Sequence, residues 1–318
     1  MSTAIIGAGP CGLVAGRLLQ AAGEPVVLFD KGRGFGGRMA TRRHASGCFD
    51  HGVPGFRMND AGWNATLARW HQCDVCAPVE LGGIQHWTGV GGMSAIGRWL
   101  ARPLEVRRAT HVAAVSSEGE LWDAQHQSLG HFDRVVITAP APQAAELADR
   151  AAPDCIASLR QVHYAPCWTL MVGLRRPPKA VGAVPQPLAQ VIRETTKPGR
   201  GHTGECWVAH ADSAWSTAHL EASADWVQSI LWDAFQGIVG MGHRDAMHVA
   251  THRWRYARVT RPLEGPGYLA SPQAPIFFAG DYCLGDGVEC AFRSAEAVAA
   301  AVLTTTGRFP QGDTAIPK

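Results

Sequence analysis

The sequence lacks the features that mark membrane-spanning, repetitive or nucleic-acid-binding chains. No apolar stretch approaches the ~20 residues that cross a bilayer, and the most apolar late segment, 288–303, is interrupted by Glu289, Arg293 and Glu296. No internal repeat or low-complexity tract occurs. The formal net charge is only +2 and no Lys/Arg-rich helix accompanies it. We therefore expect neither nucleic acid nor a membrane surface as a partner, and nothing indicates an obligate protein partner.

Cysteine use argues against a disulfide framework. The nine cysteines are an odd number and are scattered through 318 residues, a chain too long to need disulfide staples. Cys73 and Cys76, with His71 nearby, have a metal-like spacing, but no second pair completes a four-ligand set, so we expect no metal. The first apolar stretch is too short for a signal peptide. Reduced thiols in the cytoplasm fit these observations best.

The N-terminal region contains a glycine-rich turn between a strand and a helix. The apolar run 4–6 precedes Gly7-Ala8-Gly9-Pro10-Cys11-Gly12, and the helix-forming segment 13–19 follows. Glycine allows backbone N–H groups to approach a pyrophosphate at such a turn. A second apolar run, 25–29, ends at Asp30, where a carboxylate would bind a ribose 2′-OH and disfavour a 2′-phosphate. The pattern predicts a dinucleotide site.

Two later segments extend this site to a flavin dinucleotide. Gly36-Gly37-Arg38-Met39 follows the second strand, and Arg38 is placed to neutralise a pyrophosphate oxygen. For Lys31 and Arg33 in the same loop, a solvated surface is the alternative. Further on, the buried run 276–279 leads into Gly280-Asp281, and a helix begins near Gly287. That carboxylate would lie near the ribityl chain, and the helix N–H groups would face the flavin pyrimidine edge. We therefore expect bound FAD.

Changes of hydrophobic period indicate how the chain is organised. Residues 104–139 have the pattern of a meander, with strands at 106–115, 120–125 and 132–138. Residues 155–258 alternate strands, at 167–174, 189–195, 205–211 and 247–256, with a helix over 222–239 whose apolar face would be Trp226, Ile230, Ala234 and Ile238. The sequence predicts an α/β fold. A discontinuous Rossmann-like FAD-binding domain (1–46, 86–150 and 264–318) would carry an inserted α+β substrate domain built on a mixed sheet (47–85 and 151–263).

Several blocks between Ala4 and Leu303 resemble the FAD-dependent amine-oxidase-like flavoproteins, and more narrowly the bacterial renalases. The early blocks, such as 29–34 and 36–39, are shared by the whole superfamily, whereas 197–200 (Lys-Pro-Gly-Arg) and 252–258 (His-Arg-Trp-Arg-Tyr-Ala-Arg) are more specific to renalases. The resemblance implies non-covalent FAD. It also implies oxidation of 2- or 6-dihydro isomers of NAD(P)H to NAD(P)+, with oxygen as electron acceptor and hydrogen peroxide as product.

Hydride transfer to a flavin requires a stacked and oriented donor rather than a protein nucleophile. His252, Trp254 and Tyr256 lie at period two on one predicted strand, so all three would face one side. We take them as candidate catalytic residues that line the pocket together; core packing is the alternative. The segment 197–200 is a turn by composition, either an exposed basic loop or a contact to substrate.

The residues assigned to FAD fall in the two glycine clusters, the loops that follow them and the late strand-turn-helix. They are Gly7, Gly9, Pro10, Cys11, Gly12, Asp30, Lys31, Arg33, Gly37, Arg38, Met39, Gly52, Val53, Val112, Gly280, Asp281, Gly287 and Val288.

Two departures from the renalase pattern leave the substrate open. Pro54 and Gly55 stand where an amide and an aromatic residue are usual, and the segment 287–291 has lost the usual arginine of Arg-Val-Glu-Gly-Ala. The small-molecule substrate would be a reduced nicotinamide isomer or an amine. An amine oxidase, a desaturase-type oxidoreductase of other substrate, or a flavin-binding protein without turnover are the alternatives.

Overall fold

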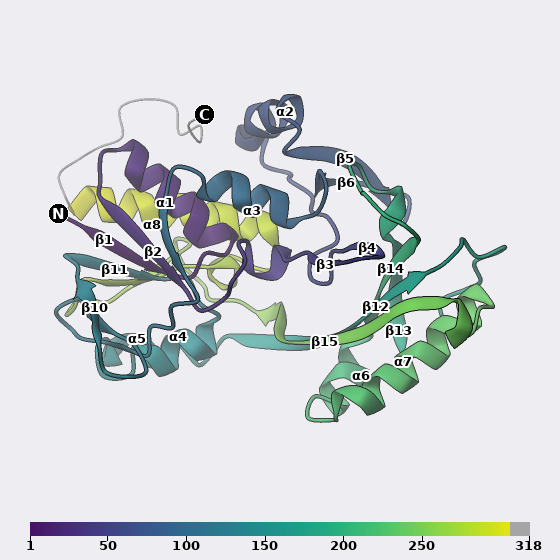
Figure 1. The fold of residues 1–318 in the computed structure, drawn as a ribbon. Coiled ribbons are helices and arrows are strands. Elements are labelled where there is room, and N and C mark those ends of the chain that lie inside the picture. The colour runs from purple at the N-terminus through teal and green to yellow at the C-terminus, as the bar shows by residue number, and fades with distance from the viewer. Residues whose placement is uncertain (306–318) are drawn as a thin grey trace.

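The computed structural model of the chain describes residues 1–305 and contains two main sheets that lie side by side (Figure 1). In the larger, six-stranded sheet every neighbouring pair is parallel except the antiparallel pair β16–β17. Its strands, in spatial order, are β16 (Leu269–Ala270), β17 (Ile276–Phe278), β11 (Arg134–Ile137), β1 (Thr3–Ile6), β2 (Val26–Asp30) and β7 (Glu105–Arg108). The sheet thus collects strands from three separate stretches of chain, as expected for a discontinuous domain.

Helices cover both faces of this sheet. Successive side chains of a strand point to opposite faces, so neighbouring residues of β1 pack in different cores. Ile5 packs in a core with helices α1 (Pro10–Ala21), α3 (Ser94–Ala101) and α8 (Val288–Thr305). Its neighbours Ala4 and Ile6 pack on the other side, against helices α4 (Ala141–Leu147) and α5 (Pro153–Leu159). Burial on both faces explains why these strands appear in the sequence as continuous apolar runs.

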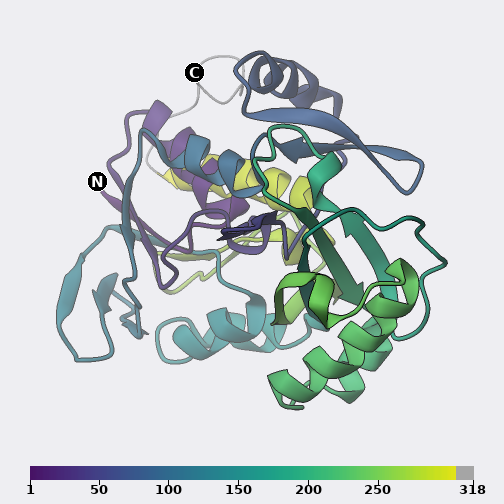
Figure 2. The same cartoon turned by 45° about the vertical axis from the view of Figure 1, so that its right-hand side comes forward.

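The smaller sheet has four strands and carries its helices on one face. It consists of β13 (Leu188–Arg193), β14 (Glu205–Ala211), β12 (His163–Leu174) and β15 (Ala246–Arg261). All of its pairs are antiparallel, which corrects the prediction of a mixed sheet. Figure 2 shows α7 (Ala224–Val239) lying along the sheet, with α6 (Ser213–Ala218) beside it.

The helix predicted over 222–239 is confirmed, but its buried face is shifted by one position. Ser223 caps its first turn and Gly240 ends it in a left-handed conformation. Val227, Leu231 and Phe235 face the sheet, whereas Trp226 is 44% exposed. The apolar residues are spread around enough of this helix that their spacing alone did not identify the packed stripe.

The predicted meander over 104–139 is wrong in its pairing. Its first strand ends at Arg108, where Ala109 takes a positive φ of 53° and the chain leaves the large sheet. The small antiparallel sheet contains only β8 (Ala114–Val115), β9 (Glu120–Trp122) and β10 (Ser128–His131). The last predicted strand, now β11, pairs in parallel with β1 instead.

The remaining elements connect the two sheets. They are the hairpin β3 (Arg42–His44) and β4 (Gly47–Phe49), the hairpin β5 (Cys76–Leu81) and β6 (Ile84–Gly89), and helix α2 (Asn64–Gln72), with short 3-10 turns at 37–39, 61–63, 194–196, 243–245 and 281–283. None of the helices within residues 1–305 is both long and apolar enough to cross a membrane. The domain boundaries given above stay a prediction, and residues 306–318 of the predicted segment 264–318 lie outside the described part.

Candidate cofactor and substrate site

The turn between β1 and α1 is built so that backbone lies open at the helix N-terminus. A Cβ on Gly12 would lie 2.0 Å from the carbonyl oxygen of Gly7, so no other residue fits there. Gly9 is the N-cap of α1, has nothing within 4 Å of its Cβ direction, and no side chain caps the helix. The first N–H groups of an α-helix lack intrahelical partners and favour an anion. This end of α1 is therefore suited to a phosphate group.

The two glycine clusters pack against each other. Gly36 donates its N–H to the carbonyl oxygen of Ala8 at 2.9 Å, and a Cβ on Gly37 would lie 3.3 Å from the Cα of Gly9. Asp30 braces the same turn, because its two carboxylate oxygens accept the N–H groups of Ala8 and Gly32, each at 2.6 Å. A carboxylate has lone pairs beyond these two bonds, so it can still accept from a ribose hydroxyl.

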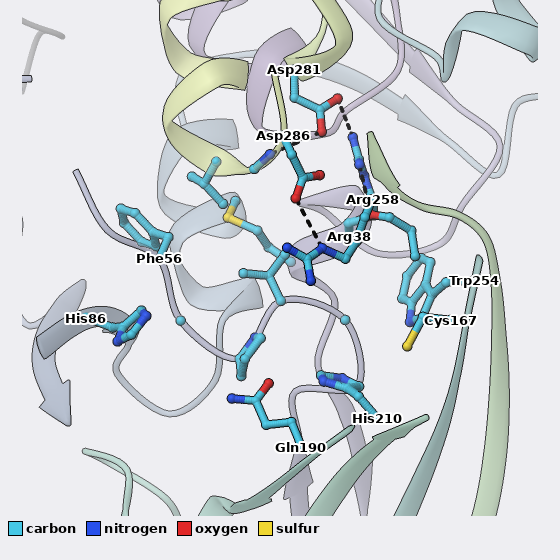
Figure 3. A pocket seen from close by; sticks show the side chains of 18 of the residues that line it. Arg38, Phe56, His86, Cys167, Gln190, His210, Trp254, Arg258, Asp281 and Asp286 are labelled. Atoms are coloured by element: carbon cyan, nitrogen blue, oxygen red, sulfur yellow. Dashed lines mark hydrogen bonds and ion pairs between the residues drawn. The ribbon is translucent and has the colours of Figure 1, made fainter. Parts of the chain in front are cut away.

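Arg38 joins the second glycine cluster to the 3-10 turn at 281–283, which precedes α8. Its Nη2 lies 2.6 Å from Oδ1 of Asp281, and its Nη1 donates to the carbonyl oxygen of Ala257 at 3.1 Å. Asp281 is buried and also accepts the N–H of Tyr282 at 3.0 Å. The guanidinium is therefore held in place by an ion pair, which the sequence did not predict. Figure 3 shows this pair on one side of a cavity.

The cavity has a volume of about 920 Å³ and lies between the two main sheets. From the side of the large sheet, Pro10 and Met39 contribute to its wall together with Arg38 and Asp281. From the smaller sheet, strands β12 to β15 contribute Cys167, Gln190, His210 and Trp254 (Figure 3). The segment 52–57 and the start of α8 complete the lining. The end of α1 thus opens toward a space large enough for a cofactor group and a substrate.

Strand register arranges the cavity face of the smaller sheet in rows. One row crosses all four strands, because Gln190 pairs with His210, His210 with Thr169, and Thr169 with His252. The next row in the direction of the cavity holds Cys167 and its partner Trp254. Trp254 is fixed by a hydrogen bond from its Nε1 to the carbonyl oxygen of His51, at 2.8 Å.

Of the three residues predicted to line the pocket together, Trp254 lines it and the other two do not. The pairing of β12 and β15 is irregular, since Ala165 pairs with Arg258 while Cys167 pairs with Trp254. This irregularity breaks the period of two. Tyr256 packs against Tyr164 instead, with ring centroids 5.4 Å apart, and is not among the cavity residues.

His252 packs against the ring of Trp254 and is not among the cavity residues. Its ring centroid is 4.5 Å from that of Trp254 and 4.9 Å from that of His51. Burial, and then the charge of Arg42, lower the pKa of His252 to about 4. Burial and neighbouring cationic or imidazole groups also lower the pKa of His51 to about 4. Both rings are therefore neutral at physiological pH, and they act as packing for Trp254.

Two sequence families match this chain. The family of flavin-containing amine oxidoreductases matches residues 71–303, and an NAD(P)-binding Rossmann-like domain matches residues 5–70. The first match alone spans more than half of the chain. The protein belongs to the flavin-containing amine oxidoreductase family.

Solved structures of other flavoproteins share the fold of this family member. A putrescine oxidase variant aligns with a TM-score of 0.73 at 13% identity, covering 96% of this chain and 99% of the other. A protein described as a protoporphyrinogen oxidase from an Exiguobacterium species has a TM-score of 0.72 at 12% identity with the same coverage. Cyclohexylamine oxidase from Brevibacterium oxydans has a TM-score of 0.70 at 12% identity, again covering 96% and 99%. At these identities the likeness is one of fold.

FAD is the cofactor of this amine oxidoreductase. The residues predicted to bind it fall into three groups in the structure. Those that line the cavity are Pro10, Arg38, Met39, Gly52, Val53, Asp281, Gly287 and Val288. Those that shape the glycine turn or lie directly beside the cavity are Gly7, Gly9, Cys11, Gly12, Asp30, Gly37 and Gly280. Those set apart from the cavity are Lys31 and Arg33, both exposed, and Val112, which is buried in the core beneath the large sheet. The uncapped helix end, the glycine packing and the cavity that adjoins them fit a dinucleotide.

The charged side chains of the segment 197–200 are buried rather than exposed, and they are not among the cavity residues. Lys197 and Arg200 are buried against Asp50 and Glu194, with Lys197 Nζ at 3.1 Å from Asp50 and 2.5 Å from Glu194. Arg200 also pairs with Asp50. Asp50 additionally accepts Thr41 Oγ1 at 2.7 Å and the N–H of Met93 at 2.9 Å. This buried charge cluster holds the chain just before His51, Gly52 and Val53, beside the cavity.

Sequence reasoning also missed the cavity residues His210, Gln190 and Cys167. All three fall within predicted strands. A period-two pattern marks which residues of one strand share a face. It does not say which strands are neighbours or in what register. Only the pairing of the four strands brings these side chains to one wall.

Proposed function

We propose that this chain is an oxidase of the renalase type, which oxidises 2- or 6-dihydro isomers of NAD(P)H to NAD(P)+. FAD supplies the redox chemistry when bound, taking two electrons from the donor as a hydride and passing them to oxygen to give hydrogen peroxide. The observation that carries the proposal is the substrate wall of the cavity. It offers a fixed tryptophan ring beside neutral hydrogen-bonding groups, as an uncharged planar donor requires.

The chain's own residues orient the donor and stabilise charge. Trp254 cannot rotate freely because His51 holds its Nε1, so its ring is preorganised for stacking. The N-terminus of α8, which starts at Val288 on the cavity wall, favours negative charge that develops nearby. Val53 and Phe56 add apolar surface that displaces water.

The carboxylates around the cavity favour an uncharged donor over a cationic amine. Each already binds a guanidinium or N–H groups of the protein. Asp281 pairs with Arg38, Asp286 with Arg258 and the N–H of Val259, Asp212 with the first N–H groups of α6, and Glu289 with Asn59 and Asp60. An ammonium group would therefore have to compete with these partners. Oxidation of an amine or of another substrate on the same scaffold remains the second candidate.

Anaerobic stopped-flow reduction of the purified holoenzyme tests the donor. The 2- and 6-dihydro isomers of NAD(P)H should bleach the flavin at least about ten-fold faster than ordinary NADH, putrescine or cyclohexylamine. Air should then restore the yellow colour with release of hydrogen peroxide. Faster bleaching by an amine or by ordinary NADH would overturn the proposal, and no bleaching by any of them would favour a flavin-binding protein without turnover.

We also propose that FAD is held without a covalent bond. The cysteines at and beside the site support this: burial raises the pKa of the Cys167 thiol to about 11 and also raises the pKa of the Cys11 and Cys283 thiols, which disfavours the reactive thiolate. Acid precipitation should release all of the yellow colour into the supernatant as FAD. Colour that stays with the pellet, or release of FMN, would contradict this proposal.

A further inference from the structure

Gln190 and His210 lie next to each other on the cavity wall that faces Arg38 and Asp281 (Figure 3). The two residues pair directly across β13 and β14, and directly paired residues of an antiparallel sheet place their side chains about 5 Å apart on one face. Gln190 is exposed toward this space, and no other group among residues 1–305 hydrogen-bonds its amide. Its one donor group and one acceptor are therefore available to a ligand.

His210 complements this amide as a fixed neutral ring. Burial, followed by the charge of Lys197, lowers the pKa of His210 to about 4, and the ring lies beside the backbone of His51 and Gly52, which can accept its N–H. A neutral imidazole carries one N–H and one bare nitrogen. When the N–H is donated to a backbone carbonyl of His51 or Gly52, the bare nitrogen is left as an acceptor.

We propose that Gln190 and His210 form an amide-recognition pair that binds the carboxamide of the donor's pyridine ring. A carboxamide has an NH2 group and a carbonyl oxygen, so it can form reciprocal bonds with the Gln190 amide and donate its second N–H to His210. A simple amine lacks the acceptor, and a carboxylate lacks the donor. The identity of the ring rests on the proposed function, whereas the chemistry of the pair defines the ligand class as planar heteroaromatic carboxamides.

The distance between this pair and Trp254 suits such a ligand. His210 pairs with Thr169, Thr169 lies two residues from Cys167, and Cys167 pairs with Trp254. His210 and Trp254 are thus separated by two spacings between neighbouring strands and by two residues along the strand direction. Together these correspond to ~12 Å between their Cα atoms. Side chains that reach inward from both positions leave room for one six-membered ring with its carboxamide between them.

A ligand pair that differs only at the carboxamide tests the inference. NAD+ and 3-acetylpyridine adenine dinucleotide, in which a methyl replaces the NH2, are titrated separately into the oxidised holoenzyme, and the dissociation constants are read from the change in flavin absorbance. Wild-type enzyme should bind NAD+ about twenty-fold or more tightly than the analogue, because the analogue loses both neutral hydrogen bonds of the NH2 group. In Gln190→Ala this preference should fall to about five-fold, the effect of the one bond left to His210, and His210→Phe should reduce it to a similar extent.

The control is Gln85→Ala, an exposed glutamine on the neighbouring hairpin that is not among the cavity residues. It should retain the wild-type preference, and flavin content and circular dichroism should be unchanged in all three variants. No preference in wild type, or an unchanged preference in Gln190→Ala, would overturn the amide-recognition pair. Failure of the dihydro isomers to bleach the flavin would instead overturn the proposed function, because the binding measurement involves no turnover.

Discussion

Replacing Lys197 with methionine should destabilise this enzyme more than removal of any surface cation. The Lys197 side chain is fully buried, and its Nζ lies 2.5 Å from Glu194 and 3.1 Å from Asp50. Both carboxylates are buried as well, and Arg200 is the other cation of the cluster. Methionine retains most of the side-chain volume but removes the charge, so two carboxylates would share one guanidinium.

The expected cost follows from burial. Breaking a buried ion pair by removing one partner leaves an uncompensated charge in a medium of low dielectric and costs about 3–5 kcal/mol. Because domains are typically stable by only about 5–15 kcal/mol, Lys197→Met should lose a large share of the free energy of unfolding. The double variant Lys197→Met/Glu194→Gln removes one charge of each sign, so it should be more stable than Lys197→Met alone.

The cost should also depend on pH. Burial raises the pKa of the Glu194 carboxyl, and the charge of Lys197 is the strongest influence that opposes this. Without Lys197, Glu194 takes up a proton more readily in the folded state than in the unfolded state. A carboxyl with a raised folded pKa stabilises at low pH, and this stabilisation is lost as pH rises through that pKa. Lys197→Met should therefore be less destabilising at about pH 5 than at about pH 8.

Urea unfolding followed by tryptophan emission measures these differences. The control is Lys179→Met, because Lys179 is exposed and has no ion-pair partner within residues 1–305; its change should stay within about 0.5 kcal/mol. The reasoning would be refuted if Lys197→Met were within about 1 kcal/mol of the control, or if the added Glu194→Gln substitution made it still less stable.

Three further changes test the cofactor and donor sites. Arg38→Ala should weaken FAD binding about ten-fold more than Arg43→Ala, since Arg38 is held at the cavity by Asp281 whereas Arg43 is exposed and donates to the carbonyl oxygen of Gly91. Equal dissociation constants for FAD would contradict this. Trp254→Ala should slow anaerobic flavin reduction by the dihydro isomers without releasing FAD, and an unchanged rate would remove Trp254 from the donor site. Gly12→Ala should abolish FAD retention, because its Cβ would lie 2.0 Å from a backbone oxygen; purification with full flavin content would show that the turn can relax.

The cofactor side of the molecule could be predicted because its signals are local. Gly7 to Gly12 form one turn, and Asp30 bonds back to that turn through backbone groups only 22 residues away. Strands buried on both faces leave apolar runs that are visible without knowledge of their partners. Even here the sequence could not show that Arg38 and Asp281, 243 residues apart, form an ion pair.

The substrate side depends on strand pairing, which no local pattern specifies. The period of two placed Trp254 and Tyr256 on one face, but an irregularity opposite Ala165 and Cys167 separates them. Lys197 and Arg200 looked like a surface turn because charged residues are almost never buried unless they are paired. Their partner Asp50 lies about 150 residues earlier, in another part of the fold.

This division between local and long-range signals has a functional consequence. A FAD-binding turn tolerates few sequences, because glycine packing and an open helix end leave little freedom. The cavity wall opposite it is set by which residues of four antiparallel strands fall in one row, so a shift of register or a single bulge changes the groups that meet the donor. One flavin scaffold can therefore serve different substrates, and the substrate of this enzyme must be argued from Trp254, His210 and Gln190 rather than from its glycines.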